Sequence, residues 1–284
     1  NANNYAGKRI SLELIQGGKI MRIQHNITAL NAHRNLYNNN SSVGKNLEKL
    51  SSGYKINRAG DDAAGLAISE KMRAQITGLD MAKKNAEDGV SLVQTAEGAL
   101  TEVHSMLNRM VELATQSANG TYSTTNRSEM QKEINQLRSE IDRIGKASKF
   151  NGISLFKSGG SITLHVGESG ATYNQLKVSF SALSSTALGI ASGTMSISNS
   201  SSARNAISLI NTAIDKISSM RSTFGALQNR LEHTINNLGV QHENLSAAES
   251  RIRDVDMAKE MMAYTKNNIL VQASQAMLAQ ANQV

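Results

Sequence analysis

The sequence contains no cysteine, no proline and no tryptophan among its 284 residues, and aromatic side chains make up only 4% of it. Without cysteine the chain can form neither disulfide bridges nor thiolate zinc sites. The absence of proline is typical of long uninterrupted helices, because proline removes a backbone donor and kinks a helix. So few aromatic residues favour narrow seams between helices over one large core.

The charge pattern argues against several classes of partner. The formal net charge is +7, but basic and acidic residues are interleaved, as in Glu70-Lys71 and Lys259-Glu260. No aromatic and basic platform accompanies them, so we predict solvated helix faces and no nucleic-acid partner. No apolar run approaches the roughly 18 residues of a membrane-spanning helix, and we predict no membrane partner.

Residues 50–118 carry the strongest pattern in the chain. Apolar residues recur there at steps of three, four and seven, which places them on one stripe of a helix. A helix from Asp62 to Ser117 would be roughly 80 Å long at about 1.5 Å per residue, so it must pack on other helices. The stripe consists of Met72, Ile76, Leu79, Ala86, Val90, Val93, Leu100, Val103, Leu107, Val111 and Ala114.

Two further stretches repeat apolar residues at coiled-coil spacing. The first is predicted to begin at Asn126, with Glu129 as its capping-box partner, and its apolar positions are spaced four and three residues apart up to Ile144. The second begins near Ala203, and its strict seven-residue seam suits packing against several partner helices. This helix seam consists of Ile210, Ile217, Phe224, Leu231, Leu238, Leu245 and Ile252.

Both ends of the chain carry weaker amphipathic patterns. In residues 23–50 a run of asparagine and serine dilutes the apolar positions, which are Ile23, Ile27, Leu30, Tyr37, Val43, Leu47 and Leu50. Residues 253–284 continue an apolar face that holds several methionines. We expect both segments to be disordered in the monomer and to become ordered on assembly.

The segment between Phe150 and Ser202 has a different pattern. Residues 162–166 and 176–180 alternate between apolar and polar across a loop that contains glycine, which predicts one β-hairpin. Residues 179–202 are rich in serine and predict a solvent-facing loop.

The sequence offers no recognisable constellation for catalysis or metal binding. The six histidines are scattered, and the His242-Glu243 pair lacks the second histidine of a zinc-protease helix. No Gly-x-Ser-x-Gly nucleophile elbow occurs, and the glycines lack phosphate-loop spacing. We therefore predict no enzyme activity, no catalytic residue, no metal site and no cofactor.

Two blocks of sequence resemble the terminal regions of bacterial flagellins, the subunits of the flagellar filament. The first block opens LEKLSSGYKINRAGDDAAGLAIS and continues through DGVSLVQTAEGAL to ATQSANGT. The second runs from SAAESRIRDVDMAKEM to QASQAMLAQANQ. Together the similar segments cover roughly Met21 to Leu155 and Ala203 to Val284. The resemblance is to a short form of flagellin that lacks the large variable outer domain.

The resemblance and the periodicity together imply a mostly α-helical fold, a coiled-coil-like bundle rod of long helices with a small β-hairpin region. Residues 1–20 are expected to be an extension outside the fold. Residues 21–60 and 241–284 would form an inner terminal-helix domain, the filament core. Residues 61–240 would form an outer helical-bundle domain with the hairpin at 150–202.

The implied function is that of a structural subunit that self-assembles into the flagellar filament for motility. The alternative left open is a secreted or membrane-surface effector protein built from amphipathic helices. The implied partners are the chain itself as a helical homopolymer, a flagellar export chaperone, the filament cap, hook-junction proteins and a vertebrate Toll-like innate receptor. The implied location is the extracellular flagellum, reached by secretion through the flagellar export apparatus.

The resemblance also implies a surface that contacts both the innate receptor and neighbouring subunits. Its residues would be Arg109, Glu112, Leu113 and Glu133. Taken alone, they are typical of ordinary surface charge beside a seam leucine. We expect Leu113 to be exposed in the free chain because assembly would cover it.

Overall fold

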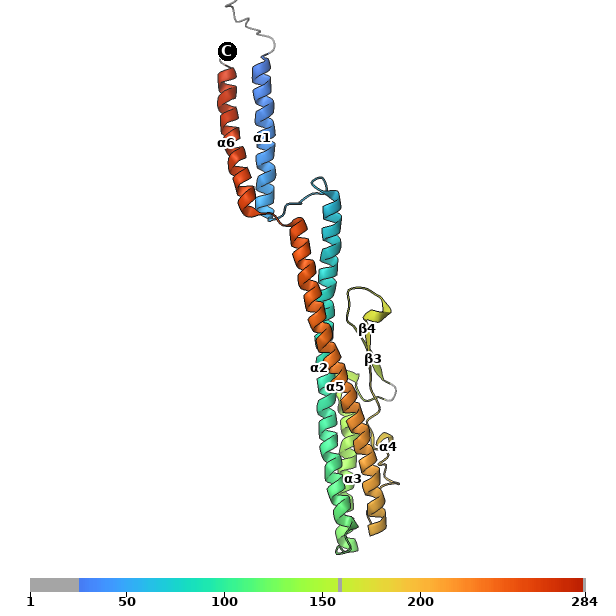
Figure 1. Cartoon of the computed structure of the whole chain (residues 1–284). Helices are drawn as coiled ribbons and strands as arrows, with labels where there is room; N and C mark the ends of the chain where they lie inside the picture. The colour runs from blue at the N-terminus through green and yellow to red at the C-terminus, as the bar shows by residue number, and fades with distance from the viewer. Residues whose placement is uncertain (1–25, 158–159, 283–284) are drawn as a thin grey trace, which may run out of the picture. The chain divides into compact units, whose positions relative to one another are not determined.

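The computed structural model describes residues 26–157 and 160–282 and divides the chain into two compact units (Figure 1). The terminal unit comprises the described residues up to 69 and from 249 onward, and the central unit comprises Glu70–Ala248. The predicted extension at residues 1–20 lies outside the described residues. The predicted inner and outer filament domains stay a prediction, because they concern places in an assembly.

Long helices dominate both units, so the predicted fold class is confirmed. The elements are α1 (Ile27–Ser52), α2 (Ala63–Ala118), α3 (Thr124–Ala147), β1 (Lys149–Phe150), β2 (Ile153–Ser154), β3 (Ser161–His165), the 3-10 helix η1 (Thr172–Asn174), β4 (Gln175–Ser179), α4 (Ser185–Leu188), α5 (Ser200–Arg253) and α6 (Met257–Ala281).

In the terminal unit, α1 and α6 pack side by side along their lengths. The Asn26 side chain caps the start of α1 by accepting from Ala29 N, and Asp256 caps α6 by accepting from Lys259 N. Helix α1 ends at Gly53, whose φ of 75° is a left-handed conformation that glycine adopts without strain.

In the central unit, α2, α3 and α5 share one apolar core. Residues spaced three and four apart on each helix turn inward, as their periodicity predicts. Helix α3 begins three residues earlier than expected, because Ser123 is its cap and accepts from Asn126 N. The prediction of Asn126 as the cap is therefore wrong. Serine and asparagine are both favoured at the N-cap position. Ser123 directly follows the turn, so the helix begins there, three residues before Asn126.

The strands within the described residues form two small antiparallel hairpins. Strands β3 and β4 pair in the predicted hairpin, with Ile162 opposite Val178. The second hairpin, β1 with β2, was not predicted. It turns through Asn151 and Gly152 with φ of 47° and 79°, since these residue types tolerate the left-handed conformations that a two-residue hairpin turn requires.

Residues 179–202 do not form the solvent-facing loop that their serine content predicts. Several of their apolar side chains belong to the main core. Asp142 on α3 accepts from Ser185 N at 2.7 Å and from Ser185 Oγ at 2.8 Å, and so ties α4 to the bundle. Because these apolar residues follow neither helical nor strand spacing, periodicity could not reveal them. They are Phe180, Leu183, Leu188, Ile190, Met195 and Ile197.

Candidate functional site

The seam predicted on α5 lies mainly inside the central unit. Ile210, Ile217, Phe224, Leu231 and Leu238 are all buried. Leu245 is half-buried and packs against the separate small cluster of Leu79, Ala82 and Leu238. Ile252 is half-buried and lies in the terminal unit. The seam thus supplies the internal core of the chain rather than a free surface.

Arg109 on α2 holds two carboxylates in place. Its Nη1 donates to Glu112 Oε2 at 2.8 Å on the same helix, and its Nε donates to Glu133 Oε1 at 2.9 Å on α3. These hydrogen bonds, chiefly that to Glu133, raise the pKa of Arg109 above its ordinary value. All three side chains are substantially exposed, so the group is a fixed charged patch that contributes little to stability.

Leu113 does not join this surface, and the expectation that it is exposed is wrong. It is 2% exposed and lies in the main core with Met110. Because α2 packs against two helices, its buried sector is wider than the single stripe that the periodicity indicates. Of the four predicted residues, the three charged ones are therefore exposed and Leu113 is not.

Helices α1 and α6 expose many large apolar side chains. Among the described residues of the two helices, the single buried residue is the polar Asn46 on α1. The exposed apolar residues, each between 39% and 71% accessible, are Ile27, Leu30, Tyr37, Leu47, Met257, Met261, Met262, Ile269, Leu270 and Met277. Of the apolar positions predicted for the N-terminal helix, four are exposed, Val43 and Leu50 are half-buried, and Ile23 lies outside the described residues. The exposed residues of α1 and α6 form an apolar surface that a monomer leaves uncovered.

Two connecting segments meet where α1 ends and α6 begins. Lys55 N donates to Arg253 O at 2.7 Å, and Val255 N donates to Gly53 O at 3.0 Å. The Arg253 guanidinium lies 4.8 Å from the centre of the Tyr54 ring, a cation–π contact. We call this group, residues 53–55 with 253–255, the joint.

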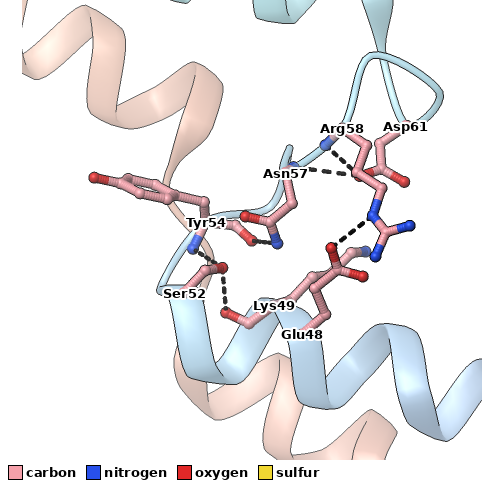
Figure 2. Close-up of polar contacts among 7 residues, drawn as sticks. All are labelled: Glu48, Lys49, Ser52, Tyr54, Asn57, Arg58 and Asp61. Atoms are coloured by element: carbon pink, nitrogen blue, oxygen red, sulfur yellow. Dashed lines mark hydrogen bonds and ion pairs between the residues drawn. The ribbon is translucent and has the colours of Figure 1, made fainter.

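The loop after the joint is held by polar contacts to α1 and to itself (Figure 2). Arg58 Nε donates to Glu48 Oε1 at 2.8 Å. Asp61 Oδ2 accepts from Arg58 N at 3.1 Å and from Asn57 N at 3.2 Å. These two backbone hydrogen bonds, with that from Arg58 the stronger influence, lower the pKa of Asp61. The loop is therefore ordered by its own charged residues.

The described part of the chain offers no metal centre: across residues 26–157 and 160–282, no three histidine, aspartate or glutamate side chains gather closely enough to hold an ion. None of the helices in these ranges combines the length and apolar character that a bilayer crossing requires. What the geometry provides is a set of helix surfaces, apolar on α1 and α6 and charged around Arg109. Such surfaces suit contacts with other proteins.

Comparison with known proteins decides the family. The bacterial flagellin N-terminal helical region matches residues 23–160, and the C-terminal helical region matches residues 207–284. A flagellin of Halalkalibacterium halodurans is 54% identical over 93% of this chain and 96% of its own length. The chain belongs to the bacterial flagellins. A flagellin of Bacillus subtilis is 50% identical, over 93% of this chain and 97% of its own length.

A solved structure extends the comparison at the level of fold. A putative flagellar hook-associated protein from Vibrio parahaemolyticus matches with a TM-score of 0.57 over 68% of this chain and 100% of its own. The sequence identity is 13%, so this match shows the shared fold alone. The resemblance to a short flagellin is confirmed, and the flagellin family is structural rather than catalytic.

The contacts that sequence reasoning missed are those of the joint and of the polar residues between α1 and α6. Backbone pairing between segments some 200 residues apart leaves no sequence signal. The polar residues did leave a sequence signal, because Asn39 and Asn46 lie seven residues apart, as do Asn267 and Ser274. A search for apolar spacing passes over asparagine and serine.

Proposed function

We propose that the chain is the structural subunit of a bacterial flagellar filament and assembles by repeated contacts with copies of itself. The observation that carries this proposal is the exposed apolar surface of α1 and α6 in a chain that matches flagellins along nearly its whole length. Copies that bury these side chains against one another remove apolar area from water, which drives association. A head-to-tail contact that does not close gives a helical filament.

The filament lies outside the cell, and we further propose that the chain reaches it through the flagellar export apparatus. An export chaperone, the filament cap and hook-junction proteins would then be its partners. The fold shared with a hook-associated protein supports the last of these, because similar helices can pack by similar contacts at a junction.

Arg109, Glu112 and Glu133 are the proposed contact surface for a Toll-like innate receptor and for neighbouring subunits. The support is their fixed geometry and exposure. Both partners would use one charged patch, so receptor binding would require the monomer. Leu113 would act here only by packing beneath α2.

Seeded elongation tests the proposed function. Monomer added to sheared filament fragments should lengthen them, as seen by electron microscopy and by rising turbidity. Failure to elongate, together with binding to lipid vesicles, would contradict the proposal and favour the alternative of an amphipathic effector protein.

A further inference from the structure

The interface between α1 and α6 mixes apolar residues with small and polar ones, and the one buried residue among those described on the two helices is the polar Asn46. Buried and half-buried residues recur along α1 at steps of three and four, the spacing of a coiled-coil seam. This series comprises Ala29, Ala32, Leu36, Asn39, Val43, Asn46 and Leu50. The corresponding residues of α6 are Glu260, Tyr264, Asn267, Val271, Ser274, Leu278 and Ala281.

Asn46 has a full set of hydrogen-bond partners in this interface. With its amide oriented to satisfy both ends, Nδ2 donates to Ser42 O and to Glu260 Oε1, each at 3.1 Å. Its Oδ1 accepts from Asn267 Nδ2 at 3.0 Å and from Tyr264 N at 3.1 Å. Asn46 is 9% exposed, so these bonds lie where water does not compete freely.

The same kind of contact recurs farther along the pair. Asn39, seven residues before Asn46, donates from Nδ2 to Ser274 Oγ at 3.0 Å, and Ser274 lies seven residues after Asn267. Beyond it, Asn26 Nδ2 donates to Ala281 O at 2.8 Å. A single antiparallel alignment of α1 and α6 therefore allows all of these hydrogen bonds to form together. We call the contacts of Asn39 and Asn46 the asparagine ladder.

We propose that the asparagine ladder sets the register in which α1 and α6 pair. The joint pins only the end of the pair where α1 stops, and the ladder extends that register outward along both helices. A slip of four residues would place Asn46 against Val271 or Ala263 in place of Asn267, and the side chains of valine and alanine neither accept nor donate hydrogen bonds. A buried amide without partners is costly, whereas an apolar seam would tolerate several registers.

This inference deepens the proposed function and rests on it in one respect. In one register, the large apolar side chains of α1 and α6 keep a single arrangement on the outside of the pair. If the outer surface contacts neighbouring copies, a uniform register makes every subunit present the same surface. The ladder would thus lower the stability of the α1–α6 pair and fix a single arrangement of its outer surface. A buried asparagine likewise fixes the register of a coiled coil and lowers its stability.

Two double variants on the same helix form a matched test. The ladder variant Asn39→Ala with Asn46→Ala removes the amides at the interface, and the control Asn38→Ala with Asn40→Ala removes the two exposed amides on either side of Asn39. Both variants gain helix propensity equally. The chain has no native cysteine, so nitroxide labels can be placed at Asn35→Cys and Gln275→Cys, both exposed.

The inter-label distance is measured by electron paramagnetic resonance, with labelled chain diluted into unlabelled chain. Measurements are made in seeded filaments and on unassembled chain in trimethylamine N-oxide, which strengthens burial. We expect one narrow distance in the parent and control. In the ladder variant we expect a second, distinct distance, from pairs shifted along the helix axis by about 6 Å, the rise of four residues. The ladder variant should also elongate seeds several-fold more slowly.

A second double variant distinguishes a change of register from unfolding of the α1–α6 pair. Asn46→Leu with Asn267→Leu replaces the polar layer by an apolar one, and should make the pair more resistant to trypsin while broadening the distance. A single parental distance in both variants, or a broad distance in the parent itself, overturns the proposal. A parent with a narrow distance that fails to elongate seeds would instead count against the proposed function.

Discussion

Arg109 shows how a single side chain can define a surface without stabilising the fold. Its two ion pairs lie in solvent, where such pairs contribute roughly 0 to 1 kcal/mol to the free energy of unfolding. Their effect is to hold a cation and two carboxylates in one arrangement across α2 and α3. A partner that desolvates this arrangement would depend on it strongly.

We expect Arg109→Ala to weaken signalling by monomer through a Toll-like receptor and to slow seeded elongation, because truncating a desolvated arginine typically costs about 2 kcal/mol or more in binding. Receptor reporter activity and elongation rate measure the two effects. Arg143→Ala is the matched control, since Arg143 forms an exposed pair with Glu140 on α3. Parental values for both activities in Arg109→Ala would remove Arg109 from the proposed surface.

Asp61 makes the loop after the joint sensitive to acid. Its pKa in the folded chain is lowered, so its contribution to stability is fully present above the unfolded value of about 3.9 and is lost as pH falls through the folded value. Hydrogen exchange, corrected for intrinsic rates, should show protection of the Asn57 and Arg58 amides falling below about pH 4. In Asp61→Asn the acceptor no longer titrates, and the same protection should not change with pH.

Among the elements, α5 illustrates what a strict seven-residue seam contributes. Leu238 is 5% exposed and packs in a small cluster with Leu79 and Ala82. We expect Leu238→Ala to lower the free energy of unfolding of the central unit by about 2 to 5 kcal/mol, because it removes buried methyl groups and leaves a cavity.

Denaturant unfolding of the Leu238→Ala variant tests this value. Val240→Ala on the same helix is the control, since Val240 is 58% exposed and its truncation should change stability by no more than about 0.5 kcal/mol. Equal stabilities for the two variants would show that Leu238 does not support the core.

For the whole molecule, the two units differ in how much they bury. The central unit contains the main core, whereas α1 and α6 bury one residue between them among those described. Limited trypsin digestion of monomer should therefore trim both ends and leave a fragment near residues 61–245. Assembled filaments should resist at the same sites, because assembly would cover α1 and α6. Uniform resistance of the monomer along its length would contradict this expectation.

Regular spacing of apolar residues by itself determined the long helices of the central unit and many of their buried residues. Each helix turns a regular stripe toward its neighbours, so Ile210, Leu231 and their companions could be assigned to the core from the sequence alone. The alternation around Ile162 and Val178 likewise determined the hairpin of β3 and β4. Family membership followed from long motifs, which need no structure to recognise.

Only the tertiary structure decided which faces meet. Leu113 lies inside because α2 has two neighbours, and Ile190 is buried although its surroundings are rich in serine and lack a period. Helix α1 turns Asn46 rather than Tyr37 toward α6, the reverse of what hydrophobicity predicts. The physical reason is the same in each case. Burial depends on what other segments of the chain place beside a residue, and a local pattern cannot contain that information.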